Sequence, residues 1–109
     1  MSDAEVPGQM RDAMRNDWNA RAREDAGYYV AFGRREQSDA DFYATATAVV
    51  NGLETELLRV PAVQRHSWKA LEIGCGPGRL MRPMSRHFAE IHGVDVSDEM
   101  IALARERLR

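Results

Sequence analysis

A chain of 109 residues with a formal net charge of −2 has room for one small domain and lacks the basic balance of a nucleic-acid or anionic-membrane binder. Its 44% hydrophobic and 29% charged residues are ordinary for a globular protein, and no apolar run approaches the roughly 20 residues of a membrane span. The single cysteine excludes an internal disulfide. Together with an N-terminus unlike a signal peptide, it predicts a cytoplasmic protein.

The N-terminal part of the chain is expected to be a polar tail followed by a helix. Residues 1–9 are expected to be disordered, with Pro7 and Gly8 as breaking residues. Residues 10–26 predict a helix that Gly27 ends, because apolar residues recur there every four positions, at Met10, Met14, Trp18 and Ala22. This stripe is narrow, so the helix should dock on the rest of the chain.

The next segment, YYVAFG at residues 28–33, is aromatic and has two interpretations. It could be a loop that pins the first helix to the core, or Tyr28 and Tyr29 could form a lid over a bound ligand. After it, Ser38 predicts an N-cap, and the helix that follows is expected to end at Pro61. The predicted apolar face of that helix consists of Phe42, Ala46, Val49, Val50, Leu53 and Leu57.

Residues 68–109 alternate strand and helix, the pattern of a parallel α/β sheet. Strands are expected at 68–73 and 91–96, with a helix at 79–89 between them. Ser97 is expected to cap a last helix at 98–109, whose inner face would hold Met100, Ile101, Ala104 and Leu108.

The turn after the first strand, in the sequence LEIGCGPG at residues 71–78, is the most specific pattern. Three glycines at alternate positions permit positive φ angles and let a ligand lie against the main chain, while the helix beyond presents free N–H groups. A dinucleotide site would favour glycine where Arg79 stands, and Glu72 would repel a pyrophosphate and attract an ammonium group. The turn therefore favours a nucleoside ligand with an amino group over a nicotinamide dinucleotide.

The turn and the segment after the second strand together resemble the class I S-adenosylmethionine-dependent methyltransferases. LEIGCGPG resembles the first motif of that family, and DVSDEMIALA at residues 95–104 resembles its D-x-S-x-x-M-[LI]-x-x-A segment. Two motifs in this order, separated by one helix, are more specific than either alone. The resemblance runs from about residue 68 onward. It implies a Rossmann-like α/β fold, S-adenosyl-L-methionine as cofactor, and methyl transfer to a small-molecule acceptor.

The resemblance also implies roles for individual residues. Glu72 would lie near the amino end of the cofactor's methionine part, Asp95 would accept hydrogen bonds from both ribose hydroxyls, and Met100 would pack on the adenine. The other implied cofactor-binding residues are Gly74, Cys75, Gly76, Gly78 and Val96, with Tyr28 and Tyr29 as a possible lid. No catalytic base is identified.

Each of these residues also has a structural interpretation. The glycines could serve the turn alone, Glu72 could be a solvated strand end, Asp95 could open a helix, and Met100 could be core. Cys75 has no evident base partner, so a packing role is expected rather than that of a reactive thiol. No metal site is predicted, because the histidines lack ligand spacing: His66, His87 and His92.

The family's sheet has about seven strands, whereas two are expected here, so the chain is expected to be truncated after the second strand. Residues 1–67 would form the tail and an N-terminal helical extension, and residues 68–109 the first half of the cofactor-binding domain. The open sheet edges predict a marginal monomer or self-association through an edge strand. The alternative to an enzyme is a non-catalytic cofactor-binding or interaction module that docks on a partner chain.

Overall fold

The computed structural model describes residues 5–31 and 35–109. The tail at 1–4 and the Phe32–Gly33 part of the aromatic segment, for which expectations were stated above, lie outside these ranges. In chain order the elements are α1 (Glu5–Val30), α2 (Asp39–Ala44), α3 (Thr47–Leu57), α4 (Ala62–Arg65), β1 (Lys69–Ile73), α5 (Met81–Met84), the 3-10 helix η1 (Ser85–His87), β2 (Glu90–Val94) and α6 (Asp98–Arg107).

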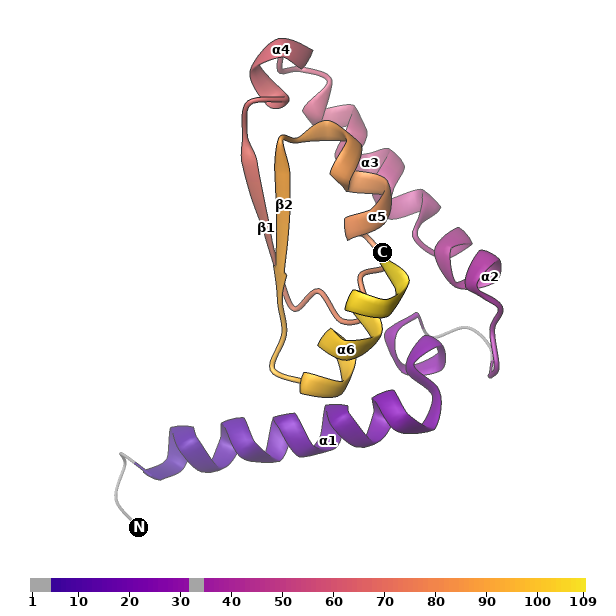
Figure 1. The fold of residues 1–109 in the computed structure, drawn as a ribbon, viewed down its shortest axis with the longest axis vertical. Helices are drawn as coiled ribbons and strands as arrows, with labels where there is room; N and C mark the ends of the chain where they lie inside the picture. Colours follow the sequence, from indigo (N-terminus) through magenta and orange to yellow (C-terminus); the bar gives the residue numbers. More distant parts are fainter. Residues whose placement is uncertain (1–4, 32–34) are drawn as a thin grey trace.

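The two strands form a parallel sheet, which confirms the predicted α/β class (Figure 1). The register pairs Lys69 with Glu90 and Ile73 with Val94. The helices α3, α5 and α6 lie on the same side of this sheet, and α1 runs beyond the carboxyl ends of both strands. Among the described residues, no helix is both long and apolar enough to cross a membrane.

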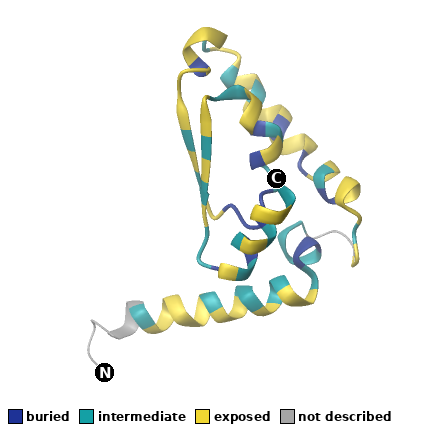
Figure 2. Ribbon diagram, viewed as in Figure 1, coloured by how far each residue is buried: buried dark blue, intermediate teal, exposed yellow. Residues whose placement is uncertain are grey.

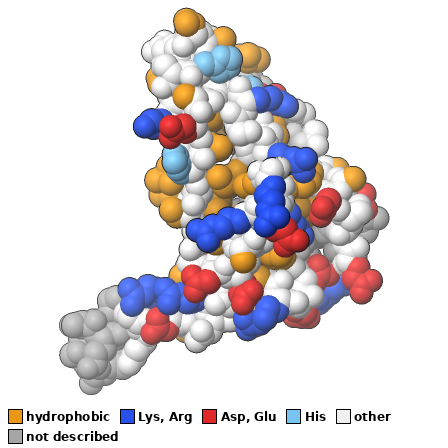
Figure 3. All heavy atoms as spheres, in the orientation of Figure 1, with side chains coloured by type: hydrophobic (Ala, Val, Ile, Leu, Met, Phe, Trp, Pro, Cys, Tyr) orange, Lys and Arg blue, Asp and Glu red, His pale blue; other side chains and the backbone are white. Residues whose placement is uncertain are grey.

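In the part of the chain that the structure describes, no helix covers the other face of the sheet. Leu71, Ile73 and Val94 share that face and are 61%, 81% and 48% exposed. The residues between them alternate to the helical side and are partly buried, as Figure 2 shows along each strand: Ala70, Glu72, Ile91 and Gly93. In the space-filling view, hydrophobic side chains gather at the surface over the strands (Figure 3). A parallel sheet with one covered face is unusual, because such sheets normally have both faces packed.

Helix α1 is longer than predicted and contains a break. It begins at Glu5, so the prediction of disorder is wrong for residues 5–9; Pro7 falls in the first turn, where its missing N–H costs little. The predicted stop at Gly27 is also wrong. The helix breaks instead at Asp25, with φ −165° and ψ 85°, and then continues to Val30. Asp25 Oδ1 accepts a hydrogen bond from the Tyr28 amide at 3.2 Å, which caps the second segment.

The predicted helix that begins after Ser38 is in fact two helices, α2 and α3. Ser38 is the N-cap, as predicted, and its hydroxyl accepts a hydrogen bond from the backbone of the first turn. The break follows because the Thr45 hydroxyl donates to the Phe42 carbonyl at 2.6 Å, while the Ala46 amide bonds to the Tyr43 carbonyl. These short-range bonds compete with the regular helical ladder.

The core lies between α3, α5 and the covered face of the sheet. Its buried members are Ala46, Val50 and Met84, with Leu57, Leu80, Phe88 and Ile91 packed against them. Phe42 is also buried, but Val49 and Leu53 of the predicted apolar face are each 43% exposed. A sheet of two strands offers α3 only a narrow surface, so part of its apolar face stays in solvent.

The predicted helix at 79–89 is shorter, because α5 passes into η1 after one turn. The Ser85 hydroxyl donates to the Arg82 carbonyl at 2.8 Å and competes for the oxygen that a continuing α-helix would use. Phe88 is already extended, with φ −131° and ψ 161°, and the chain enters β2 at Glu90.

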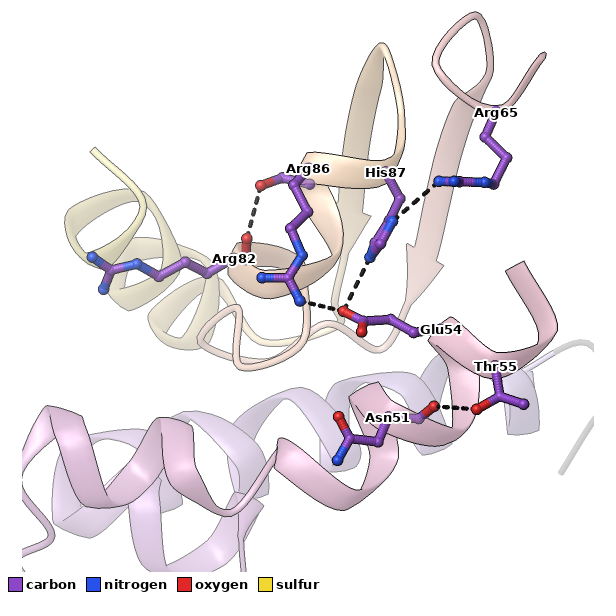
Figure 4. A network of polar contacts seen from close by, with 8 residues as sticks. Asn51, Glu54, Thr55, Arg65, Arg82, Arg86 and His87 are labelled. Atoms are coloured by element: carbon purple, nitrogen blue, oxygen red, sulfur yellow. Dashed lines mark hydrogen bonds and ion pairs between the residues drawn. The ribbon is translucent and has the colours of Figure 1, made fainter. Parts of the chain in front are cut away.

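A polar network fastens α3 and α4 to η1 (Figure 4). Arg65 is buried and its Nη1 lies 3.2 Å from His87 Nδ1. Because a guanidinium can only donate, His87 Nδ1 accepts this bond and the ring proton is on Nε2, 3.1 Å from Glu54 Oε1. Arg86 contacts the same carboxylate. These hydrogen bonds, from His87 first and Arg86 second, hold the pKa of Glu54 below its ordinary range.

This network predicts a pH-dependent part of the stability. A carboxyl whose pKa falls on folding adds stability above its unfolded pKa, and this contribution is lost as the pH falls through the folded-state pKa. As the pH is lowered from about 6 to about 3, the unfolding temperature of the wild type should therefore approach that of Glu54→Gln. Glu56→Gln is the matched control, since Glu56 is 66% exposed beside Arg59. Parallel curves for the wild type and Glu54→Gln would rule out this contribution.

Candidate functional site

A cavity of about 710 Å³ lies between α1 and the carboxyl ends of the two strands. Its size is typical of small-molecule sites, and this end of a parallel sheet is where α/β proteins bind ligands. The walls come from α1, both strand ends, the glycine loop at residues 74–78 and α6. The lining residues are Met14, Trp18, Tyr29, Val30, Glu72, Ile73, Gly74, Gly76, Arg79, Leu80, Val94, Asp95, Val96 and Met100.

The structure brings most of the sequence-predicted cofactor residues to this cavity: Glu72, Gly74, Gly76, Asp95, Val96 and Met100. Tyr29 of the possible lid lines it as well. Tyr28 does not; its ring lies 3.8 Å from the Arg35 guanidinium. Cys75 and Gly78 are buried within the loop and are not part of the lining.

The glycine loop adopts a conformation that favours glycine. Gly74, Gly76 and Gly78 have φ angles of 75°, 55° and 87°, in the left-handed region. A Cβ at Gly74 would meet nothing within 4 Å, so this position opens the main chain to the cavity. A Cβ at Gly78 would lie 2.8 Å from Leu108 Cδ1, so this position lets α6 pack closely on the loop.

Asp95 holds the loop from the end of β2. Its Oδ2 accepts a hydrogen bond from the Gly76 amide at 2.9 Å, and its Oδ1 accepts one from the Ser97 amide at 2.9 Å. Each carboxylate oxygen has room for a second donor, so Asp95 can receive two further hydroxyl groups. Asp95 is therefore at once a structural clamp and a potential acceptor for a ligand diol.

Glu72 presents a second carboxylate with a different character. It lies on β1 and is partly buried; loss of solvation raises the pKa of Glu72, and the Arg79 guanidinium partly opposes this rise. Arg79 is itself held by Thr45, since its Nη1 donates to the Thr45 carbonyl at 3.3 Å. A desolvated carboxylate gains more from a ligand cation than an exposed one does. Glu72 is thus chemically suited to an ammonium group.

Cys75 has the environment of a packing residue. It is 4% exposed, and burial raises the pKa of the Cys75 thiol, with the Asp95 and Glu72 carboxylates acting in the same direction. Because the thiolate is the nucleophilic form, these shifts make Cys75 a poor nucleophile. Among the described residues, no group of three or more His, Cys, Asp or Glu side chains could hold a metal ion.

Helix α1 supplies a wall that the sequence did not indicate. Met14 and Trp18 were assigned to a packing stripe, yet both line the cavity, and Met14 is 52% exposed. The Arg21 guanidinium lies 4.7 Å from the Trp18 ring and 5.4 Å from that of Tyr29, which joins the two aromatic residues at the rim. The only signal in the sequence was an apolar stripe too narrow for a core helix.

Two comparisons with known proteins each match part of the chain. Residues 70–109 match the family model of the methyltransferase domain. Over 48 residues the chain is 40% identical to dTDP-3-amino-3,6-dideoxy-alpha-D-glucopyranose N,N-dimethyltransferase of Streptomyces fradiae; this stretch covers 41% of the chain and only 19% of the relative. No solved structure matches the chain. Residues 70–109 are thus similar to a methyltransferase domain, and the chain spans about a fifth of the length of the curated relative that it matches.

Proposed function

We propose that the chain binds S-adenosyl-L-methionine in the cavity between α1 and the strand ends and takes part in methyl transfer to a small-molecule acceptor. The observation that carries this proposal is the lining of one cavity by Glu72, Asp95 and the open main chain at Gly74. The proposed division into residues 1–67 and 68–109 does not separate functions, because α1 forms one wall of the cavity. The proposed setting is the cytoplasm.

The acceptor groups and the walls of the cavity fit the chemistry of this cofactor. Desolvated Glu72 would receive the ammonium group, and Asp95 would accept from the ribose hydroxyls while it retains its backbone bonds. Met100, 1% exposed, would pack against the adenine. The cofactor supplies an electrophilic methyl group on a sulfonium. The residues of this chain would bind and orient the cofactor, and Met14 and Trp18 of α1 would exclude water from the cavity.

An amine is the acceptor class that we propose. The name of the Streptomyces fradiae relative describes N,N-dimethylation of an amino sugar nucleotide. Transfer to nitrogen uses the nitrogen lone pair, so the amine must react in its neutral form. The acceptor would enter from the solvent side of the cavity.

Glu72 allows a test that separates recognition of the amino acid from recognition of the nucleoside. Glu72→Gln is expected to weaken binding of S-adenosylmethionine about tenfold, because it removes the charge opposite the ammonium. Binding of 5′-methylthioadenosine, which lacks the amino acid part, should be unchanged. Calorimetric titration of both ligands, with NAD as a control, measures this difference. Equal weakening of both ligands would refute the placement of Glu72, and saturable NAD binding alone would refute the proposal.

The bare sheet face supports a second candidate, a non-catalytic module that docks on a partner chain. Leu71, Ile73 and Val94 present apolar surface there that no helix among the described residues covers, although Ile73 and Val94 also line the cavity. Turnover with small amines by this chain alone would favour the enzyme. Cofactor binding without turnover, with turnover restored by a second polypeptide, would favour the module.

A further inference from the structure

One side chain of helix α1, Asn19, accepts two hydrogen bonds at the N-terminus of α6. Asn19 Oδ1 accepts a hydrogen bond from the Ser97 hydroxyl at 2.5 Å and another from the Glu99 amide at 3.2 Å. The first amides of a helix have no partner within the helix, so they need an acceptor from outside. Asn19 therefore acts as a cap for α6 from an element 78 positions earlier in the chain.

Ser97, which Asn19 contacts, also contacts Asp95, the proposed acceptor of the ribose hydroxyls. Ser97 is fully buried, and its amide donates to Asp95 Oδ1 at 2.9 Å. Its hydroxyl accepts a hydrogen bond from the Met100 amide at 3.1 Å while it donates to Asn19. The two bonds of this hydroxyl fix the Ser97 side chain, and the Ser97 amide fixes one oxygen of Asp95. A continuous path thus runs from α1 through Ser97 to Asp95 and onward to the Gly76 amide.

The remaining polar contacts between α1 and this region are weaker. Arg15 Nε reaches the Val96 carbonyl at 3.4 Å, and Arg23 reaches Glu99 at 3.4 Å with both side chains largely in solvent. Exposed pairs of this kind contribute little. The stretch of α1 that carries these contacts also carries Met14 and Trp18 into the cavity wall. Asn19 is thus the main polar anchor of a helix that covers the candidate cofactor site.

We infer that Asn19 is a positioning residue: through Ser97 it fixes Asp95, and it couples docking of α1 to occupancy of the cavity. This inference rests on the proposed function, because Asp95 is the proposed ribose acceptor. The coupling is reciprocal, so if docked α1 raises affinity for the ligand, the ligand must favour docked α1 to the same extent.

Three variants test the inference with S-adenosylhomocysteine as the probe. Asn19→Leu removes the acceptor, whereas Asn19→Asp keeps an acceptor oxygen at the same position. Asn16→Leu is the matched control, because it is the same substitution at an exposed position of the same helix. Titration calorimetry gives the affinity, and amide hydrogen exchange reports docking of α1 and order around Asp95.

Asn19→Leu is expected to weaken binding about tenfold, since the Ser97 hydroxyl and the partly buried Glu99 amide lose their acceptor. Asn19→Asp and Asn16→Leu should stay within about threefold of the wild type. In the wild type, the probe should slow amide exchange in α1. Equal affinity of Asn19→Leu and Asn16→Leu would overturn the inference. So would slower exchange in the glycine loop without any change in α1, and this wild-type measurement decides the matter if Asn19→Leu does not fold.

Failure of the wild type to bind the probe would count against the proposed function rather than against the path from Asn19 to Asp95. The path from Asn19 to Asp95 is then tested without ligand. The measurement is hydrogen exchange of the Ser97 and Gly76 amides, which both donate to Asp95. They should exchange faster in Asn19→Leu than in Asn16→Leu. Equal rates would overturn the inference.

Discussion

Asp95→Ala is expected to weaken binding of S-adenosylmethionine at least about a hundredfold and to lower the free energy of unfolding by about 3 kcal/mol. Both effects have one origin. The carboxylate would accept the ribose hydroxyls, and it also holds the amides of Gly76 and Ser97 at 2.9 Å each. Hydrogen bonds to a charged acceptor are stronger than neutral ones, and their loss leaves both amides without this partner. Asparagine would not restore the site, because its amide nitrogen would face one of these donors.

The matched control for this prediction is Asp98→Ala. Asp98 is exposed in the first turn of α6 and interacts mainly with the helix dipole, so its loss should cost about 0.5 kcal/mol and leave binding unchanged. Titration calorimetry and urea unfolding measure the two quantities. A folded Asp95→Ala protein that binds the cofactor as tightly as Asp98→Ala would remove Asp95 from the site.

Gly93→Val is expected to destabilise the protein by about 3 kcal/mol, although valine is the better strand former. A Cβ at Gly93 would lie 2.5 Å from Met81 Sδ, 2.7 Å from Cys75 Sγ and 2.8 Å from Cys75 Cβ. The Met81 side chain can move, but Cys75 is fixed by the loop that follows β1. The added atoms would therefore push α5 and the glycine loop away from the sheet. Urea unfolding followed by circular dichroism gives the change in free energy.

Gly52→Ala is the control, and it is expected to change the free energy of unfolding in the opposite direction. Gly52 lies inside α3, and a Cβ there would meet nothing within 4 Å. Alanine should therefore stabilise the protein by about 0.5 to 1 kcal/mol, because it restricts the unfolded chain and favours the helix. Stabilisation by Gly93→Val would show that the sheet and α5 are not packed as closely as the structure describes.

The parts of the fold that the sequence predicted are those with strong local signals. Ser38 and Ser97 each cap a helix as predicted, because a serine hydroxyl before an acidic first turn has one favourable role. Both strands and the glycine turn between them were also predicted, since a short apolar run before alternate glycines has few other solutions.

The errors arose where short side chains or distant elements decide the structure. The break between α2 and α3 depends on the Thr45 hydroxyl, and the end of α5 on the Ser85 hydroxyl; either side chain is compatible with a continuous helix. Likewise, no local pattern indicates that Asn19 caps α6 or that Trp18 lines a cavity. These roles follow only from the packing of α1 against residues near the other end of the chain.

The burial of Cys75 gives this chain an internal chemical reporter. Cys75 belongs to the glycine loop that Asp95 holds, its thiol lies close to Gly93, and it is the only cysteine in the sequence. Alkylating reagents can reach it only when the loop opens, and its raised pKa keeps the reaction slow until then. The rate of modification therefore measures how often the loop leaves its place. A ligand that closes the cavity should protect the thiol, without any label having to be introduced.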